Sequence, residues 1–173
     1  MDKIDYVMKL ALHILELAYS AHEEAERHGI QGGGTIELHA SAPELVAQAA
    51  DYFPPNDIVA ATVMADNSTT EIDESDIKTA RLRIAPVERQ KIVHAAIHLL
   101  VDVGLIAHSE HDFHPEAVTD YRLTPEGWAV KKGRGSNGSS SAPMSPEEFF
   151  KRYGAPLSKK KSEIGRASCR ERV

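Results

Sequence analysis

The sequence of 173 residues contains a single cysteine, Cys169, and only 6% aromatic residues. One thiol excludes an intramolecular disulfide and a zinc site built from several cysteines. The apolar stretch Leu10–Leu17 is interrupted by His13 and Glu16, and no run is long enough to span a membrane. We therefore expect a cytoplasmic protein that has no secretory signal and does not enter a membrane.

The sequence also lacks the usual signatures of catalysis. Gly32–Gly34 is a bare glycine triplet rather than a phosphate-binding loop after a strand, and no serine lies in a nucleophile-elbow sequence. The carboxylates of the first half are spread as on a solvated surface rather than paired within apolar sequence. We expect a protein that is not an enzyme and has no cofactor.

The last eleven residues, Glu163–Val173, read EIGRASCRERV and resemble the in-frame translation of a sequencing adapter. We treat this segment as an artefact and leave it out of the charge count. Residues 1–77 then carry 3 basic and 15 acidic side chains, whereas residues 78–162 carry 14 basic and 9 acidic ones. Such a change of sign is expected where only one part of a chain meets a polyanion, although an acidic helix and a basic tail on a solvated surface would produce it too.

Apolar residues at three-and-four spacing predict a long first helix over Asp2–His28, ended by Gly29 and the glycine triplet. Its broad apolar stripe indicates either a helix buried between two layers or one that also meets a second subunit. We expect a winged-helix domain with an insertion over 1–131, a flexible linker over 132–144 that is rich in glycine and serine, and a short helical segment over 145–162. That last segment starts with the helix signal Ser145-Pro146-Glu147-Glu148 and either docks on the domain, meets a partner or orders only on binding.

Between these segments, local signals predict a series of short elements. Ser41 and Glu44 fit a capping box that opens a helix over 42–52, and Ile58–Met64 is either a strand or a short helix. Pro86 predicts a break between two helices, which we place at Ser75–Ile84 and Val87–Val103. The other expected elements are a strand at Thr35–His39, strands at Leu105–Ser109 and Val118–Leu123, and a helix at Pro125–Val130.

The order of helix, Gly104-Leu105-Ile106, strand, polar loop, strand and Leu123-Thr124-Pro125-Glu126-Gly127-Trp128 resembles the second half of a winged helix-turn-helix domain. It is similar to MarR-like and PadR-like regulators and to small phage winged-helix proteins of unknown function. The resemblance covers about Ser75–Val130. It implies a mainly α fold with a small β-hairpin wing (α+β), with the long N-terminal helix added in front.

In such folds the helix before the hairpin enters the major groove of double-stranded DNA. The resemblance thus implies a prokaryotic or phage transcriptional regulator that binds duplex DNA. The broad apolar stripe of the first helix makes a homodimer through that helix a further expectation. Arg89 and Gln90 would reach base edges, with His94 on the same outward face. The cations Lys78, Arg81, Arg83 and Lys91 would neutralise phosphates. The candidate DNA-binding residues are Lys78, Arg81, Arg83, Arg89, Gln90, Lys91 and His94.

The expected wing, Glu110–Ala117, reads EHDFHPEA and has no Arg or Lys to offer a phosphate. An acidic wing leaves a second interpretation open, in which the winged helix is a protein–protein interaction module, such as a phage accessory or assembly factor, that does not bind DNA. Histidines around the helix and wing also raise the alternatives of a metal site or a pH-sensitive wing. We assign no metal site, and its candidates would be His94, His98, His108, His111 and His114.

Overall fold

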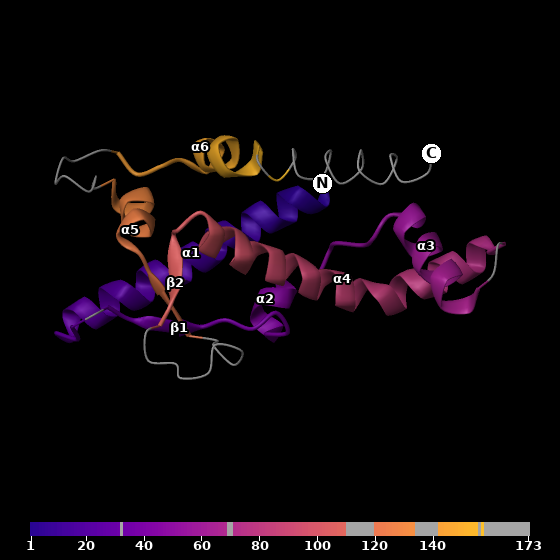
Figure 1. Cartoon of the computed structure of the whole chain (residues 1–173), viewed down its shortest axis with the longest axis horizontal. Helices are drawn as coiled ribbons and strands as arrows, with labels where there is room; N and C mark the ends of the chain where they lie inside the picture. The colour runs from indigo at the N-terminus through magenta and orange to yellow at the C-terminus, as the bar shows by residue number, and fades with distance from the viewer. Residues whose placement is uncertain (32, 69–70, 110–119, 134–141, 156, 158–173) are drawn as a thin grey trace, which may run out of the picture. The chain divides into compact units, whose positions relative to one another are not determined.

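Figure 1 shows the computed structural model of the chain, which describes residues 1–31, 33–68, 71–109, 120–133, 142–155 and 157. It is mainly helical, with 67% helix and one small three-stranded antiparallel sheet, so the expected α+β class is confirmed at this level. The chain divides into two compact units, Met1–Leu38 with Ala96–Val173, and His39–Ala95. The expected domain, linker and tail boundaries stay predictions.

Helix α1, Lys3–Arg27, is the core helix of the first unit. Asp2 and Asp5 form a reciprocal capping box at its start, and Gly29 follows its end with a φ of 67°. One apolar face of α1 is buried, as the three-and-four spacing predicted, and its buried residues are Val7, Met8, Leu10, Ala11, Ile14, Leu15, Ala18 and Ala25. The prediction of this helix and of its glycine end is confirmed.

The sheet consists of β1 (Thr35–Glu37), β2 (Ile106–His108) and β3 (Asp120–Leu123), in the order β1-β3-β2. β2 and β3 form the expected antiparallel hairpin, in which Ile106 pairs with Leu123. Gly104 has a φ of 76°, a conformation that favours glycine and lets the chain leave the preceding helix for β2. The acidic loop between β2 and β3 lies outside the described residues.

Helix α5, Pro125–Lys132, closes the hairpin as predicted. The Thr124 hydroxyl accepts a 3.1 Å hydrogen bond from the Gly127 amide and donates one to the Gly104 carbonyl, so the helix start is fastened to the turn before β2. A Cβ at Gly127 would lie 2.2 Å from the Leu105 carbonyl oxygen. Only glycine therefore lets α5 approach this turn so closely.

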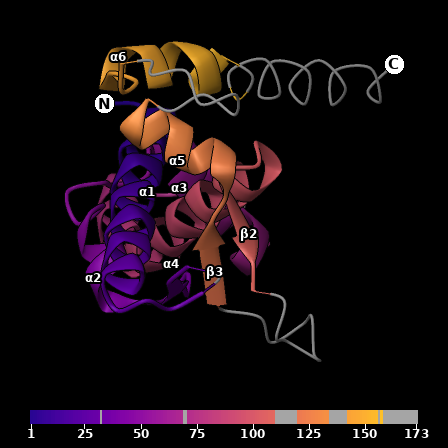
Figure 2. The same cartoon turned by 90° about the vertical axis from the view of Figure 1, so that its left-hand side faces the viewer.

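The described part of the C-terminal segment packs on α1 of the first unit, in line with the first of the three alternatives expected for it. Ser145 caps α6 (Pro146–Phe149), and a single π-helical turn, η2 (Phe150–Gly154), follows. Phe149 is fully buried, and Gly154 lies against the Met8 side chain of α1. Figure 1 and Figure 2 both show α6 above α5.

The second unit contains α2 (Pro43–Ala47) and α3 (Asn56–Asn67). The predicted capping box of Ser41 and Glu44 is wrong: the N-cap is Ala42, no side chain caps the helix, and α2 ends at Ala47 instead of running to residue 52. Pro43 takes the first helical position, where its missing N–H costs nothing, and this shifts the start past Ser41. The ambiguous segment Ile58–Met64 is helical and lies within α3.

Helix α4 runs without interruption over Glu74–Asp102, with Pro86 inside it. The predicted break at Pro86 is therefore wrong. The missing hydrogen bond at a proline leaves the carbonyl four residues earlier without its partner, and here that residue, Leu82, is exposed to water at 65%. Packing of Ala80 and Ile84 against Val59 and Val63 of α3 holds the first turns in place, so burial outweighs the proline cost.

Candidate nucleic-acid interface

The seven candidate DNA-binding residues all lie on α4 but do not share one face. Residues 78 and 89 are eleven positions apart, about three turns, so Lys78 and Arg89 point the same way, with Arg81 close by. We call these three the pocket face, because Lys78 and Arg81 line a pocket within the second unit. The remaining candidates lie on another side of α4 together with Val87, and they recur there at three-and-four spacing. All of these residues are exposed, so we call them the exposed face: Arg83, Val87, Gln90, Lys91 and His94.

Arg89 holds the second unit together rather than projecting into solvent. Its Nε donates a 3.1 Å hydrogen bond to the Tyr52 carbonyl, and its guanidinium carbon lies 4.9 Å from the centroid of the Phe53 ring. The side chain is half-buried. The expectation that Arg89 lies on an outward face beside Gln90 and Lys91 is wrong, because the segment after α2 covers it.

Two cations of the exposed face have acidic partners. Lys91 Nζ lies 2.7 Å from Oε1 of Glu88, a carboxylate that is only 5% exposed, and Arg83 lies 3.7 Å from Asp66 of α3. Both basic side chains remain more than 60% exposed, so each can reach a phosphate. The Arg83–Asp66 pair is exposed on both sides and is weak, whereas Lys91 neutralises a buried carboxylate. Glu88 went unnoticed in the sequence, although an acid three positions before Lys91 is a recognisable helix pair.

Gln90 and His94 are exposed one turn apart on the same face as Lys91. A glutamine amide can make the bidentate contact that adenine offers in the major groove, and an imidazole can donate or accept a hydrogen bond at a base edge. The first turn of α4, in contrast, carries Glu74 and Asp76. Base contacts are therefore chemically feasible in the middle of α4 and unfavourable at its start.

No family model, curated protein or solved structure matches this chain. The geometry of the described residues thus carries the interpretation.

The histidines form no recognisable metal centre in the part of the chain that the structure describes, where no group of three His, Cys, Asp or Glu side chains is placed to hold a metal ion. His94 and His98 are exposed one turn apart on α4. His108 lies on β2 with its ring centroid 4.7 Å from that of Tyr121. His111 and His114 fall outside the described residues.

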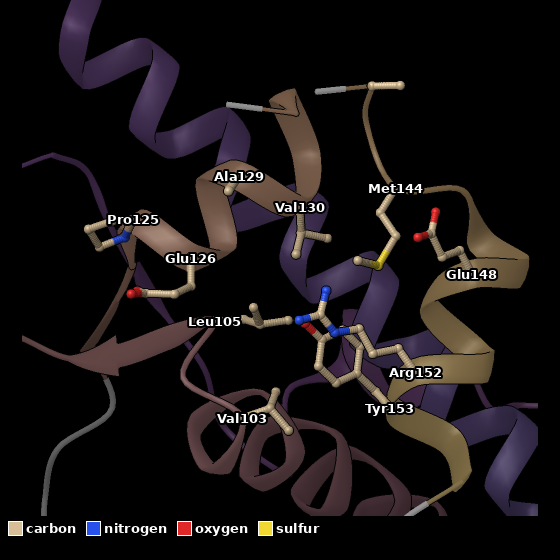
Figure 3. Close-up of a pocket in the computed structure, with 11 residues that line it drawn as sticks. Val103, Leu105, Pro125, Glu126, Ala129, Val130, Met144, Glu148, Arg152 and Tyr153 are labelled. Carbon is tan, nitrogen blue, oxygen red and sulfur yellow. The ribbon is translucent and has the colours of Figure 1, made fainter. Parts of the chain in front are cut away.

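A pocket of about 490 Å³ opens between α5, the end of α4 and the C-terminal segment (Figure 3). Its floor is apolar and includes Leu105, Val130 and Met144, while Glu126, Glu148 and Arg152 stand at its sides. Arg152 and Tyr153 project into the space from η2. Carboxylates and a guanidinium occur together in this lining, so it favours neither an anionic nor a cationic ligand.

None of the helices that the structure describes has the length and apolar content needed to cross a bilayer. On α1, Leu10 is buried inside the first unit, whereas Leu17 is 40% exposed. The dimer through the first helix stays a prediction, and Leu17 is the large apolar side chain that α1 leaves for such a contact.

Proposed function

We propose that this chain is a winged-helix DNA-binding protein, a prokaryotic or phage transcriptional regulator that contacts the major groove with the exposed face of α4. The observation that carries the proposal is the direct succession of a long helix, the Gly104 turn and an antiparallel hairpin closed by α5. A winged helix places its hairpin after its DNA-facing helix in this way. Because Pro86 makes no break, the two helices of the motif are α3 and α4.

Gln90 and His94 have the donors and acceptors for base edges. Lys91 lies within one turn of both, and Arg83 lies about two turns before Gln90, so both cations are placed for phosphates. On binding, each cation would exchange its carboxylate partner for a phosphate. The Arg83–Asp66 pair is exposed on both sides and contributes little to stability, so its exchange costs the protein little. Parting Lys91 from the buried Glu88 carboxylate costs more, and the phosphate contact has to offset that cost. A dimer through α1 would present two such faces to a two-fold symmetric site.

The proposal is tested by fluorescence anisotropy of labelled duplex DNA of mixed sequence, titrated with the full chain over a series of salt concentrations. Phosphate contacts release counterions, so the logarithm of the binding constant should fall linearly with the logarithm of the salt concentration, by about 0.9 for each phosphate. No change of anisotropy at the lowest salt would overturn the proposal.

One observation favours the second candidate function, a winged-helix module that binds protein instead of DNA. Val87 lies in the middle of the exposed face and is 53% exposed, while Lys91 and Arg83 beside it already have acidic partners. An apolar centre surrounded by polar residues is typical of protein interfaces. A pulldown that recovers a stable protein partner, together with a flat response to DNA, would favour this function.

A further inference from the structure

A pocket of about 410 Å³ lies within the second unit, between the beginning of α3 and the first two turns of α4. It takes no part in the proposed DNA contact, because the pocket face and the exposed face are different sides of α4. Cations and uncharged hydrogen-bond donors contribute most of its lining, which consists of Asn56, Glu74, Ser75, Ile77, Lys78 and Arg81.

Arg81 is the unusual member of this lining. Its side chain is half-buried, and its Nε atom is shielded from water yet has no hydrogen-bond partner among the described residues. A buried donor on a charged group costs free energy unless a partner is supplied, and native structures seldom leave one unmatched. The guanidinium of Arg81 thus retains hydrogen-bonding capacity that none of the described residues uses.

Lys78 adds a second positive charge to the same pocket. It is exposed, and no ion pair joins it to any residue that the structure describes. Ser75 contributes a hydroxyl and Asn56 an amide, both of which can donate hydrogen bonds. The only acidic side chain in the lining is Glu74, so two cations stand against one carboxylate.

We propose that this pocket binds a phosphate group, as inorganic phosphate or as a phosphate monoester, through Arg81 and Lys78. A guanidinium matches two oxygens of a phosphate with two parallel hydrogen bonds, and the ammonium group supplies a third, less directional contact. The volume exceeds what the phosphate alone needs, which leaves room for the organic part of a monoester. Ile77 forms the apolar wall beside that space.

The experiment follows the Nε–H resonance of Arg81 in ¹⁵N-labelled full chain, assigned by its loss in Arg81→Lys. Inorganic phosphate, phosphoserine and, at matched ionic strength, sodium chloride are added in separate titrations. We expect the Arg81 signal to shift and saturate with phosphate and phosphoserine but not with chloride. Lys78→Met should weaken phosphate binding about tenfold, as the loss of one charge-assisted contact does.

Two variants make the test specific. Glu74→Gln removes the opposing carboxylate and should tighten phosphate binding several-fold. If Arg81 has only a structural role, this variant leaves the response of the Arg81 signal to phosphate unchanged. Arg83→Gln removes a cation from the other face of α4 and should leave the binding constant as it was. Equal, unsaturated shifts with phosphate and chloride would overturn the proposal. So would a signal that responds to duplex DNA alone, since the pocket would then hold a backbone phosphate.

Discussion

The guanidinium of Arg89 lies over the ring of Phe53, with 4.9 Å between the guanidinium carbon and the ring centroid. The same side chain donates a hydrogen bond to the carbonyl of Tyr52. These two contacts fasten the segment between α2 and α3 to the middle of α4. A residue that the sequence offered as a base-reading arginine thus stabilises the second unit.

We predict that Arg89→Met lowers the free energy of unfolding by about 1–2 kcal/mol, because it removes one hydrogen bond from a charged donor and one cation–π contact. Urea denaturation followed by circular dichroism measures the change. Gln90→Met, one position along on the exposed face, is the matched control and should unfold like the unaltered chain. If Arg89→Met is as stable as that control, the contacts of Arg89 with Tyr52 and Phe53 do not stabilise the second unit.

Gly127→Ala should destabilise the first unit by about 1–3 kcal/mol, the usual effect of forcing a methyl group into a filled space. The reason is the 2.2 Å that would separate the new Cβ from the Leu105 carbonyl oxygen. The midpoint of thermal unfolding reports the loss. Ala129→Gly, also in α5, provides a comparison in which the glycine effect on a helix acts without a clash. An unchanged midpoint for Gly127→Ala would mean that α5 does not approach the turn before β2 as closely as described.

The C-terminal segment contributes to the core through Phe149. Phe149→Ala should cost about 3–5 kcal/mol, as truncation of a fully buried aromatic does, whereas Phe150→Ala should cost much less because Phe150 is half-buried. Guanidinium denaturation of both variants measures the difference. Equal, small effects would show that the segment is detached from α1 in solution.

A cluster on α1 and α5 makes stability depend on pH. The Tyr19 hydroxyl donates a 2.9 Å hydrogen bond to Glu23, and Lys132 lies 3.3 Å from the same carboxylate oxygen. The bond from Tyr19 chiefly lowers the pKa of Glu23 below its ordinary value of 4.5, and the contact with Glu23 chiefly raises the pKa of Lys132 above 10.5. The charged forms of both side chains are thus favoured in the folded protein.

The contribution of Glu23 is complete above pH 4.5 and is lost as the pH falls through its lowered pKa. That of Lys132 is complete below pH 10.5 and is lost as the pH rises through its raised pKa. Glu23→Gln should therefore reduce the free energy of unfolding at neutral pH, and its difference from the unaltered chain should shrink in acid. Tyr19→Phe should reproduce part of this loss. A difference that stays constant down to about pH 3 would contradict the account.

Much of the first unit could be predicted because its signals are local. Thr124 and Pro125 place the start of α5, and Gly104 places the end of α4, each through a conformation or cap that the residue type itself favours. The long first helix follows from its apolar spacing. These elements needed no knowledge of distant contacts.

The second unit departed from prediction where distant contacts decide the outcome. Pro86 has the local chemistry of a helix break, but the packing of Ile84 against α3 keeps α4 continuous. Because α4 is continuous, its basic residues lie on two different faces of one helix. A count of charges along the sequence does not predict this division. The partner of Arg89 is a main-chain carbonyl 37 positions earlier, and nothing in the sequence of either segment indicates that pairing.

The most direct test of the central claim, that the exposed face of α4 contacts DNA, compares Lys91→Met with Lys78→Met in the anisotropy titration. The two variants lose the same charge from the same helix but from different faces. We predict that Lys91→Met weakens binding and reduces the salt slope by about one, while Lys78→Met leaves both unchanged. Equal weakening by the two variants, or none by Lys91→Met, would contradict the assignment of this face.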